Sequence, residues 1–298
     1  MIKLSNGHEI DYVVASGALA FSGRGWWWER PLVWLGLIKP EFFTVFIKTL
    51  TYEPRLGNLC WWKPWTWLPF SPWSCVRLLP GGAVNKVGLT NNGIDWWCQK
   101  VAPRLDFHKF PLAGSIFGDE DELVRMARML NHFDLVALGV NGSCPNVLHL
   151  EQAEIIINCV KAVKSVSRHP LIVKVSVDQD YLAIAHGLKG VAEAIELNSV
   201  PWKTAFPDGQ RSPLSWLERK VGGGGGGVSG KPAQYHNWAA VEALAKQGSL
   251  PVIGPSVMEF EDMEKLRRLG AEAISFGAVH LRTPWKPTSF VTREMRRR

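Results

Sequence analysis

Short apolar runs alternate along this chain with segments of helical periodicity. Eight runs of three to six residues, several of them rich in Val and Ile, are typical of strands buried in a parallel sheet. The runs lie at residues 12–15, 44–47, 112–117, 135–140, 171–175, 194–197, 251–253 and 273–276. The pattern predicts eight β-strands that are separated by helices.

Three of the intervening segments carry clear helix signals. A helix is expected after Asp119, because this residue is a good N-cap and Glu122 follows three positions later, as in a capping box. A second helix is expected over 151–164 and a third over 259–269, where Gly270 supplies the C-terminal stop. In the first two, apolar residues share one face: Leu123, Met126, Ala127 and Leu130 in the first, and Ile156, Ile157, Val160 and Val163 in the second.

Eight alternations of strand and helix favour a (β/α)8 barrel, also called a TIM barrel. A doubly wound sheet would require a glycine-rich turn directly after the first strand, and Ser16-Gly17-Ala18 does not provide one. The predicted barrel is a single domain over residues 1–298. Two segments interrupt it: a Trp- and Pro-rich insertion at 59–80 after the second strand, and a long loop at 199–235 after the sixth, which contains six consecutive glycines.

The composition excludes several classes of protein. Hydrophobic residues make up 46% of the 298 positions, which is too much for a disordered chain. The cysteines include no C-x-x-C pair and the histidines no H-E-x-x-H pair, so we expect no disulfide framework and no metal site. Reduced thiols are typical of the cytoplasm, where we expect the protein to act.

The net charge of +7 comes from 34 basic against 27 acidic residues. Much of the excess is local, since Arg293, Arg296, Arg297 and Arg298 close the chain, where cations suit the end of a helix. No nucleic-acid partner is therefore expected. Residues 1–11 lack the apolar stretch of a signal peptide, and no apolar run approaches the ~20 residues that span a bilayer.

Tryptophan is concentrated in the first third of the chain. Eleven of the 15 lie before residue 100, and five lie between Trp61 and Trp73. Three interpretations of the Trp-rich segment stay open: a lid or homodimer interface, a contact with a membrane surface or quinone, and a docking site for an electron-transfer partner. The first is favoured, because large aromatic side chains are common in interfaces.

The residues that follow the predicted strands indicate a binding site, because chemistry in (β/α)8 barrels gathers at the carboxyl ends of the strands. Those ends carry Ser16, Gly17, Lys48, Thr49, Asn141, Cys144, Asn146, Lys174, Asn198, Ser199, Gly254 and Gly277. Burying an unpaired ammonium is costly, so the two lysines predict an anionic ligand. Cys144 follows a strand directly, between Ser143 and Pro145, and this position favours a reactive thiol. The other four cysteines are predicted to be structural: Cys60, Cys75, Cys98 and Cys159.

The loop around Cys144, with the sequence N-G-S-C-P-N at residues 141–146, resembles the N-x-S-C-P-N catalytic loop of the dihydroorotate dehydrogenases. Further matches to this family lie at residues 15–17, 48–51, 53–55, 57–58, 85–91 and 226–232, and the resemblance extends from about residue 13 to residue 283. A cysteine rather than a serine in the loop, and no recognisable N-terminal membrane-binding extension, make the chain similar to the class 1 enzymes.

The resemblance implies FMN-dependent oxidation of dihydroorotate to orotate in pyrimidine synthesis. Cys144 would remove a proton from the substrate as general base, a hydride would pass to FMN, and Lys48 would lie between flavin and substrate. The implied substrate-binding residues are Asn85, Gly88, Leu89, Asn141, Asn146, Asn198 and Ser199. The implied cofactor-binding residues are Ser16, Gly17, Lys48, Thr49, Asn141, Lys174, Gly230, Gly254, Ser256, Gly277 and Ala278. The electron acceptor stays open, since class 1 enzymes use fumarate directly or reach NAD through a separate iron–sulfur flavoprotein.

The sequence departs from the family in two places that concern the cofactor. The loop after the seventh strand, residues 254–257, is one residue shorter and contains Pro255, which has no N–H to donate to a phosphate. Ala278 stands where a hydroxyl residue is common. Three alternatives stay open: a barrel that has lost FMN and acts as a scaffold, which this loop suggests; a related pyrimidine-reducing flavoenzyme; and a tRNA dihydrouridine synthase, which the basic composition suggests but Ser143 and Asn146 disfavour.

Overall fold

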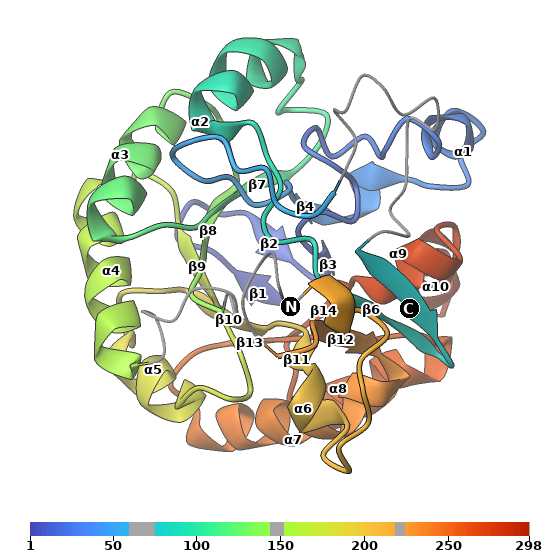
Figure 1. Ribbon diagram of the computed structural model, residues 1–298. Coiled ribbons are helices and arrows are strands. Elements are labelled where there is room, and N and C mark those ends of the chain that lie inside the picture. Colours follow the sequence, from blue (N-terminus) through green and yellow to red (C-terminus); the bar gives the residue numbers. More distant parts are fainter. Residues whose placement is uncertain (60–74, 144–151, 218–223, 298) are drawn as a thin grey trace.

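The structure, a computed structural model, describes residues 1–59, 75–143, 152–217 and 224–297. Eight parallel strands close into a barrel in chain order (Figure 1). They are β3 (Tyr12–Val14), β4 (Thr44–Phe46), β7 (Leu112–Ile116), β8 (Ala137–Asn141), β9 (Leu171–Val175), β10 (Ala194–Leu197), β13 (Val252–Gly254) and β14 (Ala273–Phe276), and β14 pairs with β3 to complete the ring. Each coincides closely with one of the eight predicted runs, so the predicted barrel is confirmed.

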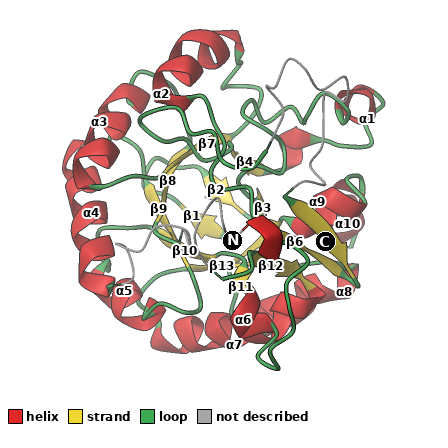
Figure 2. Cartoon of the chain, in the orientation of Figure 1, coloured by secondary structure: helices red, strands yellow, loops and turns green. Residues whose placement is uncertain are grey.

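Helices form the outer ring of the molecule (Figure 2). They are α1 (Arg30–Trp34), α2 (Gly93–Trp96), α3 (Glu120–Leu130), α4 (Ala153–Val166), α5 (Tyr181–Gly187), α6 (Trp202–Ala205), α7 (Lys231–Gln247), α8 (Phe260–Arg268), α9 (Ala278–Arg282) and α10 (Lys286–Met295). Within the described ranges, none of them has both the length and the apolar character that a membrane span needs.

The three predicted helices are present with the expected signals. The Asp119 carboxylate accepts the backbone N–H of Glu122 at 2.9 Å, and the Glu122 carboxylate accepts the backbone N–H of Asp119 at 3.3 Å, which is the predicted capping box of α3. Helix α4 begins at Ala153, and its residue Ile157 is half-buried rather than fully inward. Helix α8 ends before Gly270, whose φ of +95° stops the helix as expected.

The barrel strands alternate between residues that face the helices and residues that face the barrel interior. In β9, Val173 and Val175 belong to the large core under the helices, whereas Ile172 belongs to a second core inside the barrel. The N-terminal hairpin of β1 (Ile2–Lys3) and β2 (Glu9–Ile10) packs against this second core and closes the amino end. Further along the same inward faces lie polar residues: Ser115, Asn141, Lys174, Glu196 and Ser275. The barrel is therefore apolar at its amino end and polar at its carboxyl end.

A second, antiparallel sheet lies beside the carboxyl end of the barrel. Its strands are β11 (Val200–Pro201), β12 (Gly227–Gly230), β6 (Gly82–Asn85) and β5 (Val76–Leu79), paired in that order. This sheet joins the described end of the predicted insertion at 59–80 to the predicted loop at 199–235, and each segment contributes strands that the sequence did not indicate. Residues 231–235 of that predicted loop belong to α7. The Trp-rich stretch from Trp61 to Trp73 lies outside the described residues.

Glycine explains why the second sheet gives no apolar run in the sequence. A Cβ on Gly82 would collide with the carbonyl oxygen of Ser229 on the neighbouring strand, so only glycine permits this approach of two backbones. The pairing also joins distant segments, since the Asn85 side chain donates to the carbonyl oxygen of Gly227, 142 positions along the chain. Local periodicity carries no information about such contacts.

Candidate active site

A cavity of about 830 Å³ opens at the carboxyl end of the barrel, between the strand ends and the second sheet. Most of the residues that the sequence assigned to substrate or cofactor line it: Ser16, Gly17, Lys48, Thr49, Asn85, Gly88, Leu89, Asn141, Lys174, Asn198, Ser199, Gly277 and Ala278. Cys144 and Asn146 lie outside the described residues. The structure thus brings together side chains from strands that are far apart in the sequence.

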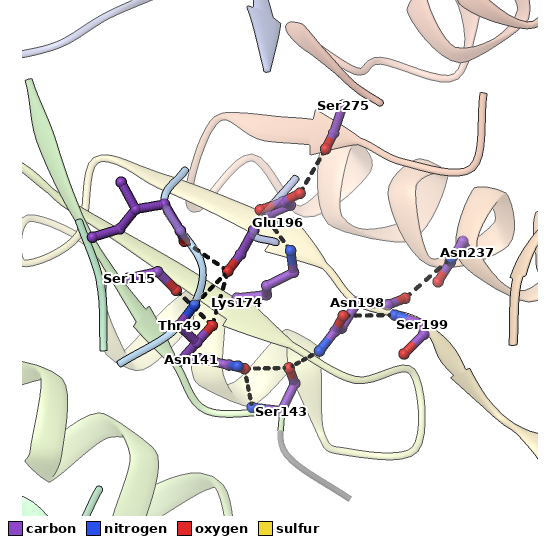
Figure 3. Close-up of polar contacts among 12 residues, drawn as sticks. Thr49, Ser115, Asn141, Ser143, Lys174, Glu196, Asn198, Ser199, Asn237 and Ser275 are labelled. Carbon is purple, nitrogen blue, oxygen red and sulfur yellow. Dashed lines mark hydrogen bonds and ion pairs between the residues drawn. The ribbon is translucent and has the colours of Figure 1, made fainter. Parts of the chain in front are cut away.

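Hydrogen bonds fix two of the lining asparagines relative to each other (Figure 3). The Ser143 hydroxyl donates to Asn141 Oδ1 at 2.7 Å and accepts from Asn198 Nδ2 at 2.6 Å. The Asn198 side-chain oxygen accepts the backbone N–H of Ser199 at 2.8 Å, and the Asn198 carbonyl accepts from Asn237 of α7 at 3.2 Å. The amide groups at the ends of β8 and β10 are therefore held in one orientation before any ligand binds.

A second group of hydrogen bonds holds the ends of β3 and β4 together. The Ser16 hydroxyl accepts the backbone N–H of Thr49 at 2.9 Å and donates to the carbonyl of Ile47 at 2.8 Å. The Thr49 hydroxyl lies 2.9 Å from the Ser115 hydroxyl on β7. These contacts keep the cavity wall at Ser16 and Gly17 rigid beside Lys48.

The loop after β6 supplies another part of the wall. Gly88 and Leu89 have φ values of +69° and +56°, an unusual conformation for a leucine. Asn58 stabilises this loop, because its side chain donates to the Lys86 carbonyl at 2.7 Å and its backbone N–H donates to the Val87 carbonyl at 2.9 Å. The Asn91 side chain donates to the Leu89 carbonyl at 2.7 Å from the other side.

Positive charge predominates in the cavity. Among the described residues, its lining contains four lysines and one carboxylate, namely Lys48, Lys86, Lys174, Lys203 and Asp178. Lys48 is only 7% exposed, and its Nζ lies 6.0 Å from the centre of the Phe21 ring. Lys48 and Lys174 thus face a single cavity, as their positions at strand ends predicted, and the charge balance suits an anionic ligand.

Lys174 is paired with a carboxylate that is more fully buried. Lys174 Nζ is 3.1 Å from Glu196 Oε2, and the two side chains are 13% and 3% exposed. The other carboxylate oxygen, Glu196 Oε1, accepts the Ser275 hydroxyl at 2.7 Å (Figure 3). The charges of a cavity lysine and a buried glutamate therefore compensate each other.

Aromatic side chains from the segment after β3 form the outer part of the cavity wall. The rings of Trp26 and Trp28 stack with centroids 5.2 Å apart, and Trp26 Nε1 donates to the Gly17 carbonyl at 3.0 Å. Behind them, burial raises the pKa of the Glu29 carboxyl to about 7, although the backbone N–H of Trp26 donates to it. The wall near Gly17 thus has flat apolar surfaces, and a weakly acidic group is buried next to them outside the lining.

The remaining cysteines in the described ranges have the character of structural thiols. Cys75 and Cys159 are buried and Cys98 is half-buried. Burial raises the pKa of both Cys98 and Cys159 to about 11, with a further contribution from nearby carboxylates. These two thiols are protonated at neutral pH, which makes them poor bases and poor nucleophiles.

Comparison with known proteins identifies the family. A family model described as dihydroorotate dehydrogenase matches residues 35–288. The chain belongs to the dihydroorotate dehydrogenase family. Its members are oxidoreductases, and the resemblance found in the sequence is confirmed.

Three curated relatives carry the name "Dihydroorotate dehydrogenase B (NAD(+)), catalytic subunit". The protein from Listeria innocua is 28% identical over 265 residues, which is 85% of this chain and 80% of the relative. Those from Phocaeicola vulgatus and Desulforudis audaxviator are 28% and 29% identical, and each alignment covers 80% of this chain and 76% or 75% of the relative.

Three residues that the resemblance assigns to the cofactor lie outside the cavity lining: Gly230, Gly254 and Ser256. A Cβ on Gly254 would approach Ala271 and Leu266 within 2.9 Å, so this glycine allows close packing against α8. The loop after β13 is bonded to α7 instead, because the Asn237 side chain donates to the Ser256 hydroxyl at 2.9 Å and Trp238 Nε1 donates to the Pro255 carbonyl at 3.1 Å. The loop whose sequence departs from the family, residues 254–257, is thus hydrogen-bonded to α7.

Sequence reasoning missed two residues that shape the site. Glu196 is the lone carboxylate in an apolar strand, and period-2 alternation places it on the same face of β10 as Ala194, the face that points into the barrel. That signal was available in the sequence. Asn237 lies within α7 and offered no such signal, because its contacts with Asn198 and Ser256 depend on how α7 packs against the barrel.

Replacing Gly57 with alanine is expected to destabilise the loop that carries Gly88 and Leu89. Gly57 has a φ of +50°, and an added Cβ would lie 2.6 Å from the Val87 carbonyl oxygen and collide with the Thr90 hydroxyl. We expect urea unfolding to show a loss of about 2–3 kcal/mol.

Gly190→Ala is the matched control for this substitution. Gly190 also has a positive φ, +76°, but an added Cβ there would meet nothing within 4 Å. It should cost only the strain of about 1 kcal/mol. Equal losses in the two variants would show that Gly57 makes no special contact.

Proposed function

We propose that this protein oxidises dihydroorotate to orotate with FMN as the cofactor, as a step of pyrimidine synthesis. The observation that carries the proposal is the meeting of Asn85, Asn141 and Asn198 with two strand-end lysines in one cavity. Amide side chains both donate and accept, which matches the alternating C=O and N–H edges of a pyrimidine ring. Membership of the dihydroorotate dehydrogenase family supports the same activity.

The cavity fits FMN in size and in the chemistry of its lining. Its volume of about 830 Å³ lies within the range of ~300–1,000 Å³ that is usual for cofactor and ligand sites. Gly17, with a φ of +88°, brings the backbone to the cavity wall without a side chain. The residues that would hold the flavin are Ser16, Gly17, Lys48, Thr49, Asn141, Lys174, Gly277 and Ala278. When bound, FMN would supply the hydride acceptor for the reaction.

The phosphate of the cofactor would be held differently from what the resemblance implies. The resemblance assigns Gly230, Gly254 and Ser256 to the flavin, yet these residues lie outside the cavity lining. Lysines of the lining would then compensate the charge of the phosphate in place of the usual loop donors.

The substrate would be held by groups that the structure has already oriented. The Ser143 hydroxyl fixes Asn141 and Asn198, so their remaining donors and acceptors are directed before binding. Preorganisation of this kind saves the entropy of ordering the side chains when the ligand arrives. The backbone around Gly88 and Leu89 would bind the substrate carboxylate, with Asn146 and Ser199 as further ring contacts.

Cys144 is proposed as the general base. It follows Ser143 directly in the chain, and Ser143 lies at the cavity between Asn141 and Asn198. A base beside the substrate ring would take one proton from carbon, and the neighbouring carbon would give up a hydride. Lys48, which is buried in the wall, would hold positive charge close to both reacting partners.

The electrons are proposed to leave through a separate subunit. The three relatives described above are named as catalytic subunits of NAD(+)-dependent enzymes, which implies that they work with another chain. The sequence analysis found no dinucleotide-binding turn after the first strand, so direct use of NAD by this chain is not supported.

Anaerobic reduction of the FMN-loaded protein by dihydroorotate tests the proposed function. We expect the yellow flavin to bleach on mixing, with release of orotate. The reduced protein is then mixed separately with fumarate, NAD and a quinone, and slow reoxidation by all three would support a partner subunit. Protein that stays colourless after FMN addition would contradict the proposal and favour a barrel that has lost the flavin.

A further inference from the structure

A buried ion pair lies inside the barrel, next to the cavity. Lys174 on β9 and Glu196 on β10 lie directly opposite each other in the strand register, and both face inward. Their charged atoms are 3.1 Å apart, and Ser275 on β14 donates to the second carboxylate oxygen at 2.7 Å. Side chains from three strands therefore hold one carboxylate beside one ammonium.

The two members of the pair differ in their access to the cavity. Lys174 lines the cavity, whereas Glu196 lies behind it, with 3% of its side chain exposed. A ligand in the cavity could therefore contact the ammonium directly, whereas the carboxylate would act on the ligand only by changing the charge and position of the ammonium. At this depth water screens the charges weakly, so the field of the lysine is reduced mainly by its partner.

We propose that Glu196 is a positioning residue that sets the electron affinity of the bound flavin by pairing with Lys174. This inference rests on the proposed function, because it requires FMN in the cavity. A reduced flavin carries more negative charge than an oxidised one, so an uncompensated ammonium nearby would stabilise the reduced form. The carboxylate removes part of that stabilisation and makes the flavin a better electron donor.

The same pair also serves to aim the lysine. An ammonium at the end of a four-carbon side chain has many rotamers, and a carboxylate fixed by the Ser275 hydroxyl restricts them. Loss of the Ser275 hydroxyl would leave both charges in place. It should therefore affect the flavin much less than loss of the carboxylate.

The test measures two properties of the flavin that need no turnover. FMN-loaded Glu196→Gln keeps the shape of the side chain and loses its charge. We expect sulfite, which adds to oxidised flavin as an anion, to bind about tenfold more tightly than in the starting protein. The flavin reduction potential should rise by about 30 mV, which corresponds to a tenfold change in a two-electron equilibrium.

Three further variants keep the inference falsifiable if Glu196→Gln fails to fold. Lys174→Met leaves the carboxylate without its partner and should weaken sulfite binding, whereas the Lys174→Met/Glu196→Leu double variant loses both charges and should bind sulfite at least about tenfold more tightly than Lys174→Met. The Ser275→Ala variant should shift sulfite affinity by less than about threefold. Equal sulfite affinities in Lys174→Met and in the double variant would show that Glu196 does not compensate Lys174, and would overturn the inference.

The outcomes also separate this inference from the proposed function. A starting protein that binds no FMN would refute the function and, with it, the inference. A Glu196→Gln protein that binds FMN with an unchanged potential and unchanged sulfite affinity would refute the inference alone. In that case the assignment of the cavity to FMN and dihydroorotate would stand.

Discussion

Replacing Cys144 with alanine is expected to slow the reduction of bound flavin by dihydroorotate about 10²–10⁴-fold at neutral pH. The proposed base is then absent, so proton removal from the substrate depends on water. Orotate should still bind, because the contacts from Asn85, Asn141 and Asn198 do not involve the thiol. Anaerobic stopped-flow mixing gives the reduction rate, and spectral titration of the oxidised protein gives the orotate affinity.

Cys98→Ala is the matched control. The Cys98 thiol is half-buried outside the cavity lining, and burial raises its pKa to about 11, so it is protonated at neutral pH. Its removal should leave the reduction rate within about twofold of the starting protein. Near-normal reduction in Cys144→Ala would refute the assignment of the base, whereas slow reduction together with lost orotate binding would indicate a damaged site.

Acidification is expected to destabilise the folded protein through His280. This histidine is 3% exposed, and in the described structure neither ring nitrogen has a hydrogen-bond partner. Burial lowers its pKa to about 3, so the folded protein keeps it neutral while the unfolded chain binds a proton below its ordinary value of 6.5. The contribution of His280 to stability is therefore complete above that ordinary value and falls as the pH drops toward 3. We expect the loss from His280 between pH 7.5 and pH 5 to be about 2 kcal/mol.

A second buried group acts in the opposite direction. Burial raises the pKa of Glu29 to about 7, so the folded state favours the protonated carboxyl and gains stability as the pH falls through that value. The two effects offset each other in the starting protein. The contribution of His280 must therefore be read from the difference between two proteins.

The His280→Leu variant isolates this contribution. Its free energy of unfolding, measured with urea at pH 7.5 and pH 5, should rise by about 2 kcal/mol relative to the starting protein over that interval. His108→Gln removes an exposed imidazole and should follow the starting protein at both values. If His280→Leu also follows the starting protein, the buried histidine contributes nothing to the acid response.

The course of the barrel was readable from the sequence because parallel strands covered by helices are buried on both faces. Runs such as Leu171–Val175 therefore carry few polar residues, and each run marked a strand. The strand-end rule then located Lys48, Asn141, Lys174 and Asn198, all of which line the cavity. The second sheet escaped this reasoning, because β12 is built from glycine and small residues and pairs with a segment 142 positions away.

The sequence by itself determined the barrel, the family and the position along the chain of most cavity residues, because these depend on local periodicity and short motifs. Only the tertiary structure decided which of those residues lie close together and which hydrogen bonds and ion pairs they form. It turned the loop at Ser256 toward α7, since Asn237 and Trp238 offer donors there. It also placed Glu196 beside Lys174, since neighbouring strands bring inward residues of equal height together. Charge compensation depends on distance in space, which no spacing along the chain specifies.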